Sequence, residues 1–588
     1  MYIAVAQINP TTGALRENAT MMLDVMEGLA RSPYPPDLVV FPAFALTGCP
    51  LDGMAFFTAF AAECLDVTRM LIAQAPLPCL FGSTVPVALE WGSHFVDADV
   101  IYCKGGVGGS LGFSEEFAPH FDDISPCVKA NIDGVNTAIM LGEYPENGTD
   151  LADCDLIVVL QAKDYRGVDY MNQSSANLTG LRMLAQQADA WLVVANLVGA
   201  QDDLIFDGGS LVINPAGSVQ MAAPVFTPGL IECNLTFGRQ TRQPRAGGGL
   251  RFDLGAAIAG DRVSLKPCLP YEATWRAITL ATRDYVMKNG FTDVVIGLSG
   301  GIDSALTAAL ATDALGANQV HGVIMPSAFS ADTSRTDALE LAERLNIHCL
   351  EIPINAPVGA VQAAMQGKLG FSGSELANQN LQARMRMVYL MHLSNSYGWL
   401  LLNTGNKSET ATGFSTLYGD TAGAYAPFGN VYKTEIYELA RWRNQQGAVI
   451  PEAIMVKPPS AELYAGQLDT DSLPPYEVLD RILRLHIEDR MGVDQIVDIV
   501  ANTPQGDPVD PELVERVLLL VRQSEFKRRQ EPMAPRIGNV DMTTMRNWPV
   551  TNGFIDHFRN IKDPMATDEL LRLLRSWRRP DGWGFMAN

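Results

Sequence analysis

A strand that leads through two glycines into a helix is the feature that most restricts how this chain can fold. Residues 294–299 (VVIGLS) predict a buried strand, and residues 303–315 predict a helix. Gly300 and Gly301 lie between them and let the backbone approach a ligand closely. Consecutive N–H groups at the start of a helix favour an anion, and Asp303 falls where it could hold Mg²⁺ against phosphates. An ordinary strand–turn–helix corner is the alternative interpretation of the same residues.

The residues around this segment continue the alternation of helices and strands. They predict a helix at 271–289, a strand at 320–325, a helix at 332–345 and a strand at 348–354. Strands separated by helices indicate a parallel sheet with right-handed crossovers. The carboxyl-terminal half is therefore expected to be a doubly wound α/β domain.

The first half of the chain also alternates short β-branched runs with amphipathic stretches. Helices are expected at 17–30 and 178–190, and strands at 2–8, 37–41, 78–82, 135–141, 155–160 and 191–196. Runs of this kind predict a layered α/β sandwich.

The expected domain boundaries follow from a change in composition. Residues 241–268 are rich in Gly, Pro and Arg and lack periodicity, so we expect a linker there. One domain is then predicted at 1–240 and a second at 269–535. Residues 536–588 form a tail of unknown role, with a helix expected around 567–577.

The composition is that of a folded globular protein without membrane or nucleic-acid partners. With 588 residues and 47% hydrophobic content, the chain can bury two domain cores. Its nine cysteines form no C-x-x-C pair, which indicates a reduced cytoplasmic protein without a structural metal. The amino terminus, MYIAVAQINP, indicates a buried strand rather than a signal peptide, and no run of about 20 apolar residues predicts a membrane span. A net charge of −23 argues against nucleic-acid binding.

The loop sequence SGGIDS, from Ser299 to Ser304, resembles the signature of the PP-loop pyrophosphatase family of adenylating enzymes. No Gly-Lys-Ser/Thr follows it, as one would in a Walker A loop, so kinase-type transfer is disfavoured. The resemblance implies an enzyme that activates a carboxylate with ATP and releases pyrophosphate. By itself it leaves the substrate open.

Further motifs narrow the resemblance to NAD synthetase. They occur in order between residues 270 and 530, as NLQARMR from Asn380, LNTGNKSE from Leu402, TLYGD from Thr416, Lys433–Thr434, KPPSAEL from Lys457 and SEFKRRQ from Ser524. The resemblance implies that ATP adenylates deamido-NAD and that ammonia then displaces AMP to give NAD. Mg²⁺ would neutralise the departing pyrophosphate. Because members of this family form dimers, a homo-oligomer is expected.

The resemblance also implies roles for individual residues. Asp303 and Lys433 are the expected catalytic residues, and Asp303 and Glu409 are the expected Mg²⁺ ligands. Contacts to ATP are expected from Gly297, Leu298, Ser299, Gly300, Gly301, Ile302, Asp303, Ser304, Thr404, Lys433 and Ser460. Contacts to deamido-NAD are expected from Asn380, Arg384, Glu409 and Lys527. Taken alone, a Lys or Arg is more often a solvated surface charge and Ser460 a helix cap.

Residues 1–240 resemble the nitrilase-like glutaminase domain that is joined to the synthetase in glutamine-dependent NAD synthetases. The matches are DLVVFP from Asp37, LTG from Leu46, NLVG from Asn196 and FDGGS from Phe206. The two resemblances imply an α/β protein with a nitrilase-like αββα sandwich and a PP-loop (adenine nucleotide alpha hydrolase-like) doubly wound parallel sheet. They also imply glutamine hydrolysis through a Glu–Lys–Cys constellation and a thioester.

This chain departs from that constellation at each of its positions. Ala43 stands where the family has glutamate, and Gly142 stands where it has the cysteine nucleophile. A glycine-rich run at 105–112 replaces the lysine segment, with Lys104 and Lys129 on either side. Alanine cannot move a proton and glycine cannot form a thioester. We therefore expect an inactive glutaminase, with nitrogen supplied as free ammonia or by a separate ammonia-donor protein.

Three other interpretations stay open. The chain could hydrolyse glutamine through unrecognised residues, with Cys127 or Cys49 as the nucleophile. It could be a non-catalytic scaffold or regulatory pseudoenzyme, although the intact SGGIDS loop and the later motifs disfavour this. It could be a PP-loop enzyme that acts on RNA, which the acidic composition and the absence of a recognisable RNA-binding module disfavour.

Overall fold

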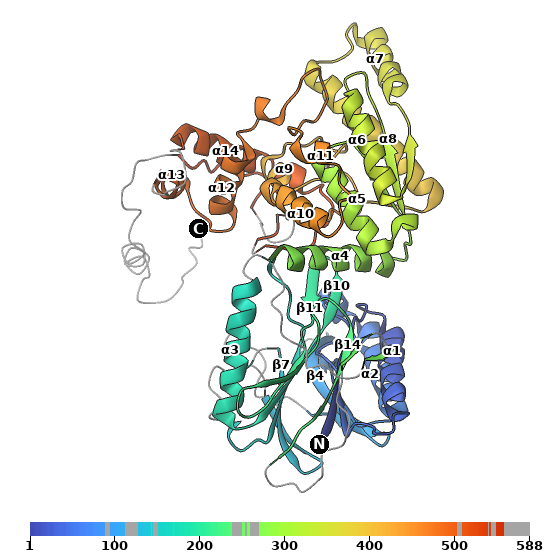
Figure 1. Ribbon diagram of the computed structural model, residues 1–588, viewed down its shortest axis with the longest axis vertical. Coiled ribbons are helices and arrows are strands. Elements are labelled where there is room, and N and C mark those ends of the chain that lie inside the picture. The colour runs from blue at the N-terminus through green and yellow to red at the C-terminus, as the bar shows by residue number, and fades with distance from the viewer. Residues whose placement is uncertain are drawn as a thin grey trace, which may run out of the picture.

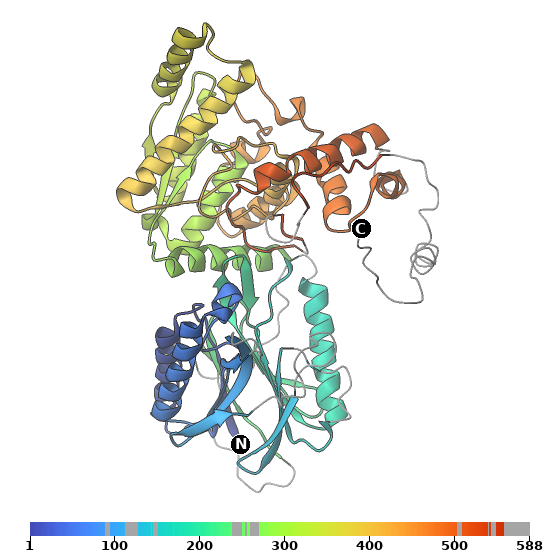
Figure 2. The same cartoon turned by 180° about the vertical axis from the view of Figure 1, so that it is seen from behind.

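The computed structural model describes residues 1–88, 94–111, 127–142, 144, 151–167, 170–237, 250–252, 256–258, 270–501, 509–538, 540–542 and 548–557. The first half of the chain builds the lower body in Figure 1 and the second half builds the upper body, with helix α4 (Pro270–Lys288) between them. The view from behind shows the same two bodies (Figure 2). The helix expected around 567–577 lies outside the described residues.

An eight-stranded sheet forms one strand layer of the lower body. Its order is β16-β15-β14-β1-β2-β3-β4-β5, in which β1, β2 and β3 are parallel and the other neighbours are antiparallel. The strands are β1 (Tyr2–Gln7), β2 (Leu38–Val40), β3 (Cys79–Ala88), β4 (His94–Lys104), β5 (Val107–Ser110), β14 (Gly229–Asn234), β15 (Leu250–Phe252) and β16 (Ala256–Ile258).

Strands β15 and β16 correct the expectation of a plain linker at 241–268. Their short runs, LRF and AAI, pair in an antiparallel ladder with the edge of β14 and extend the sheet. Three residues are too few to show the two-residue periodicity that marks a strand in a sequence.

A six-stranded sheet forms the second strand layer, in the order β13-β12-β9-β8-β7-β6. Its strands are β6 (Cys127–Ile132), β7 (Val135–Leu141), β8 (Leu156–Gln161), β9 (Trp191–Asn196), β12 (Leu211–Ile213) and β13 (Val219–Ala222). A separate hairpin consists of β10 (Val198–Gln201) and β11 (Leu204–Asp207), and it reaches up to α4 (Figure 1).

The two-residue period of the buried strands places the sheets face to face. In β8, Val158 joins the core between the two sheets, whereas the neighbouring Ile157 and Val159 join the core beneath α3. Helices α1 (Leu15–Ala30) and α2 (Thr58–Gln74), with a 3₁₀ turn at Asp52–Phe56, cover the first sheet, and α3 (Tyr170–Ala188) covers the second. This αββα sandwich confirms the predicted fold.

The upper body is built around a parallel sheet with the order β19-β18-β17-β20. Its elements are β17 (Val294–Gly297), α5 (Ile302–Leu315), β18 (Val320–Ile324), α6 (Asp332–Leu345), β19 (His348–Glu351), α7 (Asn355–Leu369), α8 (Glu375–Tyr397) and β20 (Leu400–Leu401). Val294 and Ile296 pack toward α4 and α5, whereas Val295 packs toward α8 on the opposite face. Helices on both faces confirm the doubly wound sheet.

The remaining helices lie beside this sheet (Figure 1). They are α9 (Lys407–Thr412), α10 (Lys433–Gln445), α11 (Glu452–Val456), α12 (Tyr476–Ile487), α13 (Val493–Ala501), α14 (Pro511–Gln523) and α15 (Glu525–Arg528). Leu479, Ile482 and Leu483 recur at helical spacing on α12 and anchor a core shared with α13 and α14. Among the described helices, none has the length and apolarity needed to cross a membrane.

Buried polar contacts join the two bodies at α4. The Lys288 ammonium donates to the Asn9 side chain at 2.8 Å and to the Ala200 carbonyl at 2.7 Å. Asp284 accepts from the Asn9 amide at 2.7 Å and from the Ala200 N–H at 2.8 Å. These partners lie in the first body, so α4 binds it through specific hydrogen bonds.

The segment that follows residue 535 packs onto both bodies. Arg536 forms an ion pair with Asp203 at 2.6 Å in the turn between β10 and β11. The carbonyl of Val540 accepts a hydrogen bond from the buried Lys407 at 2.7 Å. At least the first part of the expected tail is therefore part of the folded body.

Candidate active site

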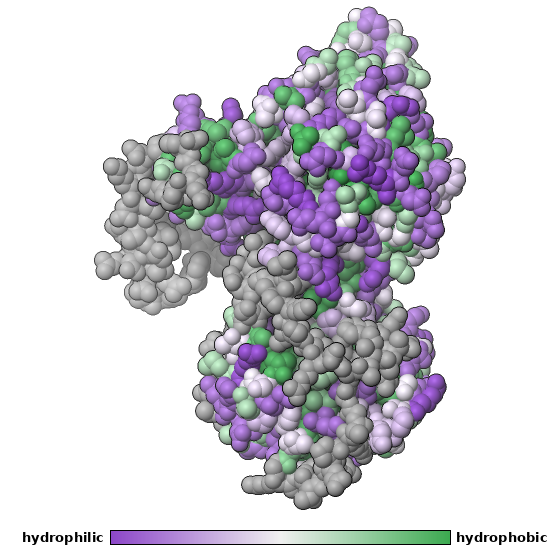
Figure 3. Space-filling model, in the orientation of Figure 1, coloured by the Kyte–Doolittle hydropathy of each residue, from purple (hydrophilic) through white to green (hydrophobic). Residues whose placement is uncertain are grey.

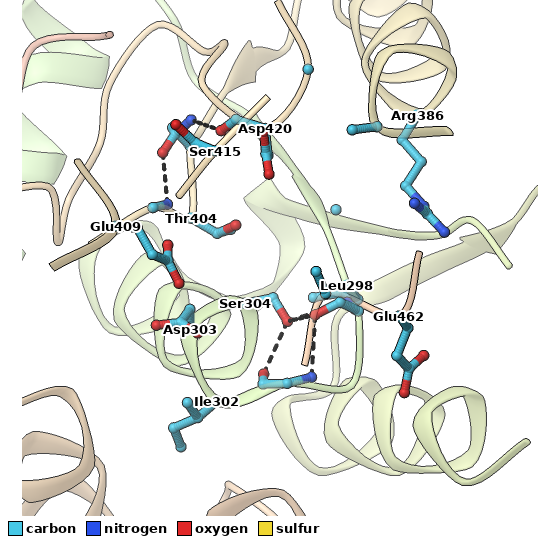
Figure 4. A pocket seen from close by; sticks show the side chains of 18 of the residues that line it. Leu298, Ile302, Asp303, Ser304, Arg386, Thr404, Glu409, Ser415, Asp420 and Glu462 are labelled. Atoms are coloured by element: carbon cyan, nitrogen blue, oxygen red, sulfur yellow. Dashed lines mark hydrogen bonds between the residues drawn. The ribbon is translucent and has the colours of Figure 1, made fainter. Parts of the chain in front are cut away.

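A cavity of about 310 Å³ lies at the carboxyl ends of the parallel strands in the upper body (Figure 4). Its walls come from the glycine loop after β17, from α8 and α9, and from residues 457–463. Ligands of open α/β sheets bind at this edge, because loops and helix amino ends converge there. The cavity is therefore the candidate active site.

The glycine loop has a shape that only glycine allows at its centre. Gly300 adopts a φ of +76°, and a Cβ atom there would lie 2.1 Å from the carbonyl oxygen of Ser334. The hydroxyls of Ser299 and Ser304 lie 3.0 Å apart, and the Gly301 N–H donates to the Ser299 hydroxyl at 3.2 Å. The loop thus closes on itself directly before α5, with the amino end of that helix in the cavity wall.

Two carboxylates and an ammonium group meet beside this loop. Lys433, at the start of α10, lies 2.5 Å from Oδ2 of Asp303 and 3.5 Å from Oε1 of Glu409. The lysine is 2% exposed, whereas the carboxylate side chains are 20% and 21% exposed toward the cavity. Figure 4 shows Asp303 and Glu409 on neighbouring walls.

Burial and charge act in opposite directions on these groups. Burial alone would lower the pKa of Lys433, but Asp303 and Glu409 outweigh it and hold that pKa above its ordinary value. Burial raises the pKa of Glu409 to about 8, and the Lys433 charge only partly opposes this shift. Asp303 adds to the increase, because two carboxylates that face one space repel each other.

These carboxylates fit the requirements of a magnesium ion. Mg²⁺ prefers oxygen ligands and is usually held by one or two carboxylates together with substrate phosphates. Asp303 and Glu409 provide two carboxylates beside a loop suited to phosphates. Within the described ranges, no set of three or more His, Cys, Asp or Glu side chains is grouped as a metal cage. Two carboxylates beside a phosphate-type loop match the usual donor set for Mg²⁺ bound together with phosphates.

Most of the residues expected to contact ATP line the cavity. They are Gly297, Leu298, Ser299, Gly301, Ile302, Asp303, Ser304, Thr404, Lys433 and Ser460, together with Glu409. Gly300 shapes the loop without lining the cavity. Ser460 is not a helix cap, because its hydroxyl donates to the Gln467 carbonyl at 2.5 Å and accepts from the Glu462 N–H at 3.1 Å, in a stretch without a helix.

The other residues expected to contact deamido-NAD meet on one loop rather than in the cavity wall. Lys527 donates to the carbonyls of Gly413 and Ser415, both at 2.7 Å. Arg384 donates to the Leu417 carbonyl at 3.1 Å, and the Asn380 side chain accepts from Thr416 at 2.8 Å. All three side chains therefore hold residues 413–417, and Ser415 on this loop lines the cavity.

Several charged residues of the cavity were absent from the predicted site. Arg386, Asp420 and Glu462 line it and are visible in Figure 4, and Asp469 also lines it. Burial lowers the pKa of Arg386, although the charges of Glu462 and Asp420 oppose this. The first three belong to the motifs NLQARMR, TLYGD and KPPSAEL, so the sequence did contain a signal for them.

Replacing Glu409 by glutamine should change how stability depends on pH. Without a bound metal ion, the pKa of Glu409 in the folded protein is about 8, above the ordinary glutamate value of 4.5. The contribution of Glu409 to the free energy of unfolding is therefore fully present below pH 4.5 and is lost as the pH rises through 8. Over that range the free energy of unfolding falls by at most about 1.4 kcal/mol per pH unit. Urea unfolding between pH 5 and 8 should show a flatter profile for Glu409→Gln. A Glu438→Gln control, on the exposed face of α10, should keep the original slope.

The two positions of the expected glutaminase triad that can be compared directly carry no acid or thiol. Ala43 is 3% exposed and belongs to the apolar core between the two sheets, with Phe44 and Leu141 packed against that core. Gly142 directly follows β7 with a φ of +78°, and its N–H donates to the Leu160 carbonyl at 2.8 Å. The space beside Gly142 is open, since no heavy atom lies within 4 Å of a Cβ placed there.

The first 240 residues contain three lysines, Lys104, Lys129 and Lys163. Lys104 pairs with Asp133 and Lys129 pairs with Asp153, and both lysines are about half exposed on the surface. Lys163 is exposed as well. Each lysine thus has its side chain at the surface rather than in the core that holds Ala43.

The cysteines suggested as replacement nucleophiles are not activated thiols. Burial raises the pKa of Cys49 to about 11, and Asp52 adds to the shift. The pKa of Cys127 is raised too, mainly by partial burial and against the effect of Lys129. Because the thiolate is the nucleophile, a raised pKa lowers the reactive fraction at neutral pH.

In comparisons with known proteins, both halves of this chain match NAD synthetases. A family model described as NAD synthase matches residues 274–531. The glutamine-dependent NAD(+) synthetase of Rhodobacter capsulatus is 35% identical, over 94% of this chain and 99% of that protein. A structure of glutamine-dependent NAD+ synthetase from Acinetobacter baumannii in complex with ADP is 30% identical, with a TM-score of 0.64 over 95% of this chain and 99% of that one.

A second solved structure supports the fold. The glutamine-dependent NAD(+) synthetase from Cytophaga hutchinsonii has a TM-score of 0.73 at 18% identity, over 97% of this chain and 99% of that one. The match to the Rhodobacter protein extends over both the sandwich and the parallel-sheet domain, as its coverage requires. The chain belongs to the glutamine-dependent NAD(+) synthetase family.

Proposed function

We propose that this chain makes NAD from deamido-NAD, ATP and ammonia, releases AMP and pyrophosphate, and carries a catalytically silent glutaminase domain. The observation that carries the synthetase part is the cavity, in which Asp303 of the SGGIDS loop lies beside Glu409 and Lys433. A phosphate-binding loop beside two carboxylates and an ammonium group suits the transfer of AMP from ATP.

In this proposal the ATP phosphates lie along residues 297–304. The N–H groups at the start of α5 and the Lys433 ammonium attract the phosphate charge, and Thr404 and Ser460 contact the nucleotide from the opposite walls. Asp303 and Glu409 would hold Mg²⁺, which would neutralise charge on the departing pyrophosphate.

Deamido-NAD binds on the side of the loop 413–417. Arg384 and Lys527 set the shape of that loop through its carbonyls, and Asn380 does so through Thr416. The loop then presents Ser415 to the cavity. These contacts support an indirect role for the three side chains in holding the dinucleotide.

The reaction has two steps. A nicotinate carboxylate oxygen attacks the α-phosphorus of ATP, and the bond from that phosphorus to the bridging oxygen breaks, so that pyrophosphate leaves. Ammonia then attacks the carbonyl carbon, the carbon–oxygen bond to AMP breaks, and the nitrogen loses a proton to give the amide. The chain positions the reactants and stabilises charge, and it needs no side-chain nucleophile.

The proposed silence of the amino-terminal domain rests on the residues at the triad positions. A thioester needs a sulfur atom and its formation needs a base, and neither Gly142 nor Ala43 supplies one. Their surroundings support the same conclusion, because Ala43 is packed in an apolar core and the three lysines of this domain lie at the surface. The nitrogen would then arrive as ammonia, either free or released by a separate donor protein.

The choice of nitrogen donor can be tested directly. Purified protein would receive ATP, Mg²⁺ and deamido-NAD, together with either ammonium chloride or ammonium-free glutamine. NAD is expected with ammonium, and glutamine should give no more than its contaminating ammonium explains. NAD formation from clean glutamine at a comparable rate would refute the silent domain, and loss of that activity in Cys127→Ala would identify the replacement nucleophile.

Glutamine use remains the competing proposal, since the relatives are named glutamine-dependent enzymes. The same assay also tests the scaffold alternative. If ATP and deamido-NAD release no pyrophosphate even with ammonium, the chain is a non-catalytic member of its family.

We also propose that the protein forms a homo-oligomer through α7 and α8. Helix α7 has no buried residue, and only Gln382, Ala383 and Leu390 are buried on the 23-residue α8. The exposed apolar side chains of this region are Met365, Leu369, Phe371, Leu376, Val388, Met391 and Tyr397. Figure 3 shows green hydrophobic residues among hydrophilic ones on the visible face of this body. A second copy of the chain would bury such a surface.

A further inference from the structure

Asn406 is not among the residues that line the cavity, but it contacts two of its walls. It is fully buried at the end of the loop between β20 and α9. Its side-chain oxygen accepts the N–H groups of Ser408 and Glu409, both at 3.1 Å. Its side-chain nitrogen donates to Oδ1 of Asp303 at 3.0 Å. A single amide thus joins the start of α9 to a carboxylate at the start of α5.

The chemistry of this position calls for a carboxamide. Two backbone N–H groups face the Asn406 oxygen, so its nitrogen end must face the Asp303 carboxylate. Aspartate could accept from α9 but would set a second acceptor against Asp303. Serine could cap α9, since it is about as good an N-cap as asparagine, but its hydroxyl is too short to reach Asp303 as well.

The two carboxylates have a reason to move apart. Asp303 and Glu409 both line the cavity, and two carboxylates that face one space repel each other. Lys433 contacts both from one side, at 2.5 and 3.5 Å. The side-chain nitrogen of Asn406 donates to Oδ1 of Asp303, the carboxylate oxygen that Lys433 does not contact. The side-chain oxygen of Asn406 accepts the Glu409 N–H. The spacing of the carboxylates is therefore set from two sides.

We propose that Asn406 is a positioning residue that sets the placement of Asp303 relative to Glu409 for the adenylation step, without itself contacting a substrate. The inference rests on the proposed synthetase function. Asn406 then has two separate roles. Its cap on α9 stabilises the fold, whereas its contact with Asp303 positions a carboxylate of the active site. Removing a hydrogen-bond partner of a metal ligand typically lowers metal affinity or activity by about 10–100-fold.

Asn406→Ser, which keeps a cap and loses the contact with Asp303, is the decisive variant. Its ammonium-dependent pyrophosphate release should fall about 10–100-fold in kcat, with the KM for ammonium unchanged. Calorimetry should show that the gain in ATP affinity on adding Mg²⁺ shrinks by a similar factor, while ATP binding without Mg²⁺ stays the same. Asn406→Ala should lose the same activity as Asn406→Ser and unfold at a lower urea concentration, because alanine cannot cap α9.

Ser374→Ala provides a matched control. Ser374 caps α8 by accepting the Ala377 N–H at 3.3 Å and contacts none of the cluster. This variant should lose a similar amount of stability and keep full activity. If Asn406→Ser matched the wild type in both kcat and Mg²⁺-dependent ATP binding, Asn406 would be only a cap and the inference would be wrong. If the wild type bound Mg·ATP but made no NAD, the proposed function would fail, and the calorimetric comparison would still decide the role of Asn406.

Discussion

Replacing Asp303 by asparagine is expected to slow ATP-dependent pyrophosphate release by about 10³-fold. Asparagine keeps the size of the side chain and can still accept a hydrogen bond from Lys433 or Asn406, but it lacks the negative charge. That charge is what a magnesium ligand needs, and only Glu409 would remain as a proposed protein ligand. Losing several kcal/mol of charge stabilisation in the transition state corresponds to this factor.

The same helix offers a matched control for this substitution. Asp313, near the other end of α5, pairs with Arg443 at 2.7 Å and accepts from the Trp275 indole at 3.0 Å. It does not line the cavity, so Asp313→Asn should lower stability and leave pyrophosphate release unchanged. Circular dichroism would establish that both variants are folded. Normal turnover by Asp303→Asn would contradict the assignment of Asp303 as a metal ligand.

The elements that could be predicted from the sequence are those whose signal is local. The helix expected at 332–345 is α6, Asp332–Leu345, because Ala338, Leu341, Ala342 and Leu345 recur at helical spacing in its second half. The glycine loop was equally predictable, since Gly300 adopts a positive φ that few other residues tolerate. Strands β15 and β16, with three residues each, lack enough length for a periodic signal and were missed.

Contacts between distant residues needed either the resemblance or the structure. Lys433 lies 130 positions from Asp303, and no periodicity indicates that this lysine is buried against two carboxylates. The family pattern selected Lys433, Arg384 and Lys527, but it does not say that the last two bind backbone carbonyls. The pair between Arg536 and Asp203, 333 positions apart, has no motif at either end and could not be expected.

Replacing Arg528 by alanine is expected to lower the free energy of unfolding of the upper body by about 3–5 kcal/mol, the usual cost of breaking a buried ion pair. The side chain is 1% exposed and lies 2.7 Å from the carboxylate of Glu525, which is itself 3% exposed. It also donates to the Ala411 carbonyl at 2.8 Å at the end of α9. Removing the guanidinium would leave a buried carboxylate and a helix-end carbonyl without this partner.

The neighbouring Arg529 provides a control that distinguishes the effect of burial from the effect of charge. Arg529 also pairs with Glu525, at 3.2 Å, but its side chain is 40% exposed. Exposed pairs contribute about 0–1 kcal/mol, because water solvates both charges when the contact breaks. Urea unfolding should therefore place Arg529→Ala close to the wild type and Arg528→Ala far below it. Equal losses would mean that the charge of Glu525, rather than the burial of Arg528 against α9, determines stability here. Since α9 carries Glu409, a weakened Arg528 contact should also reduce activity before the protein unfolds.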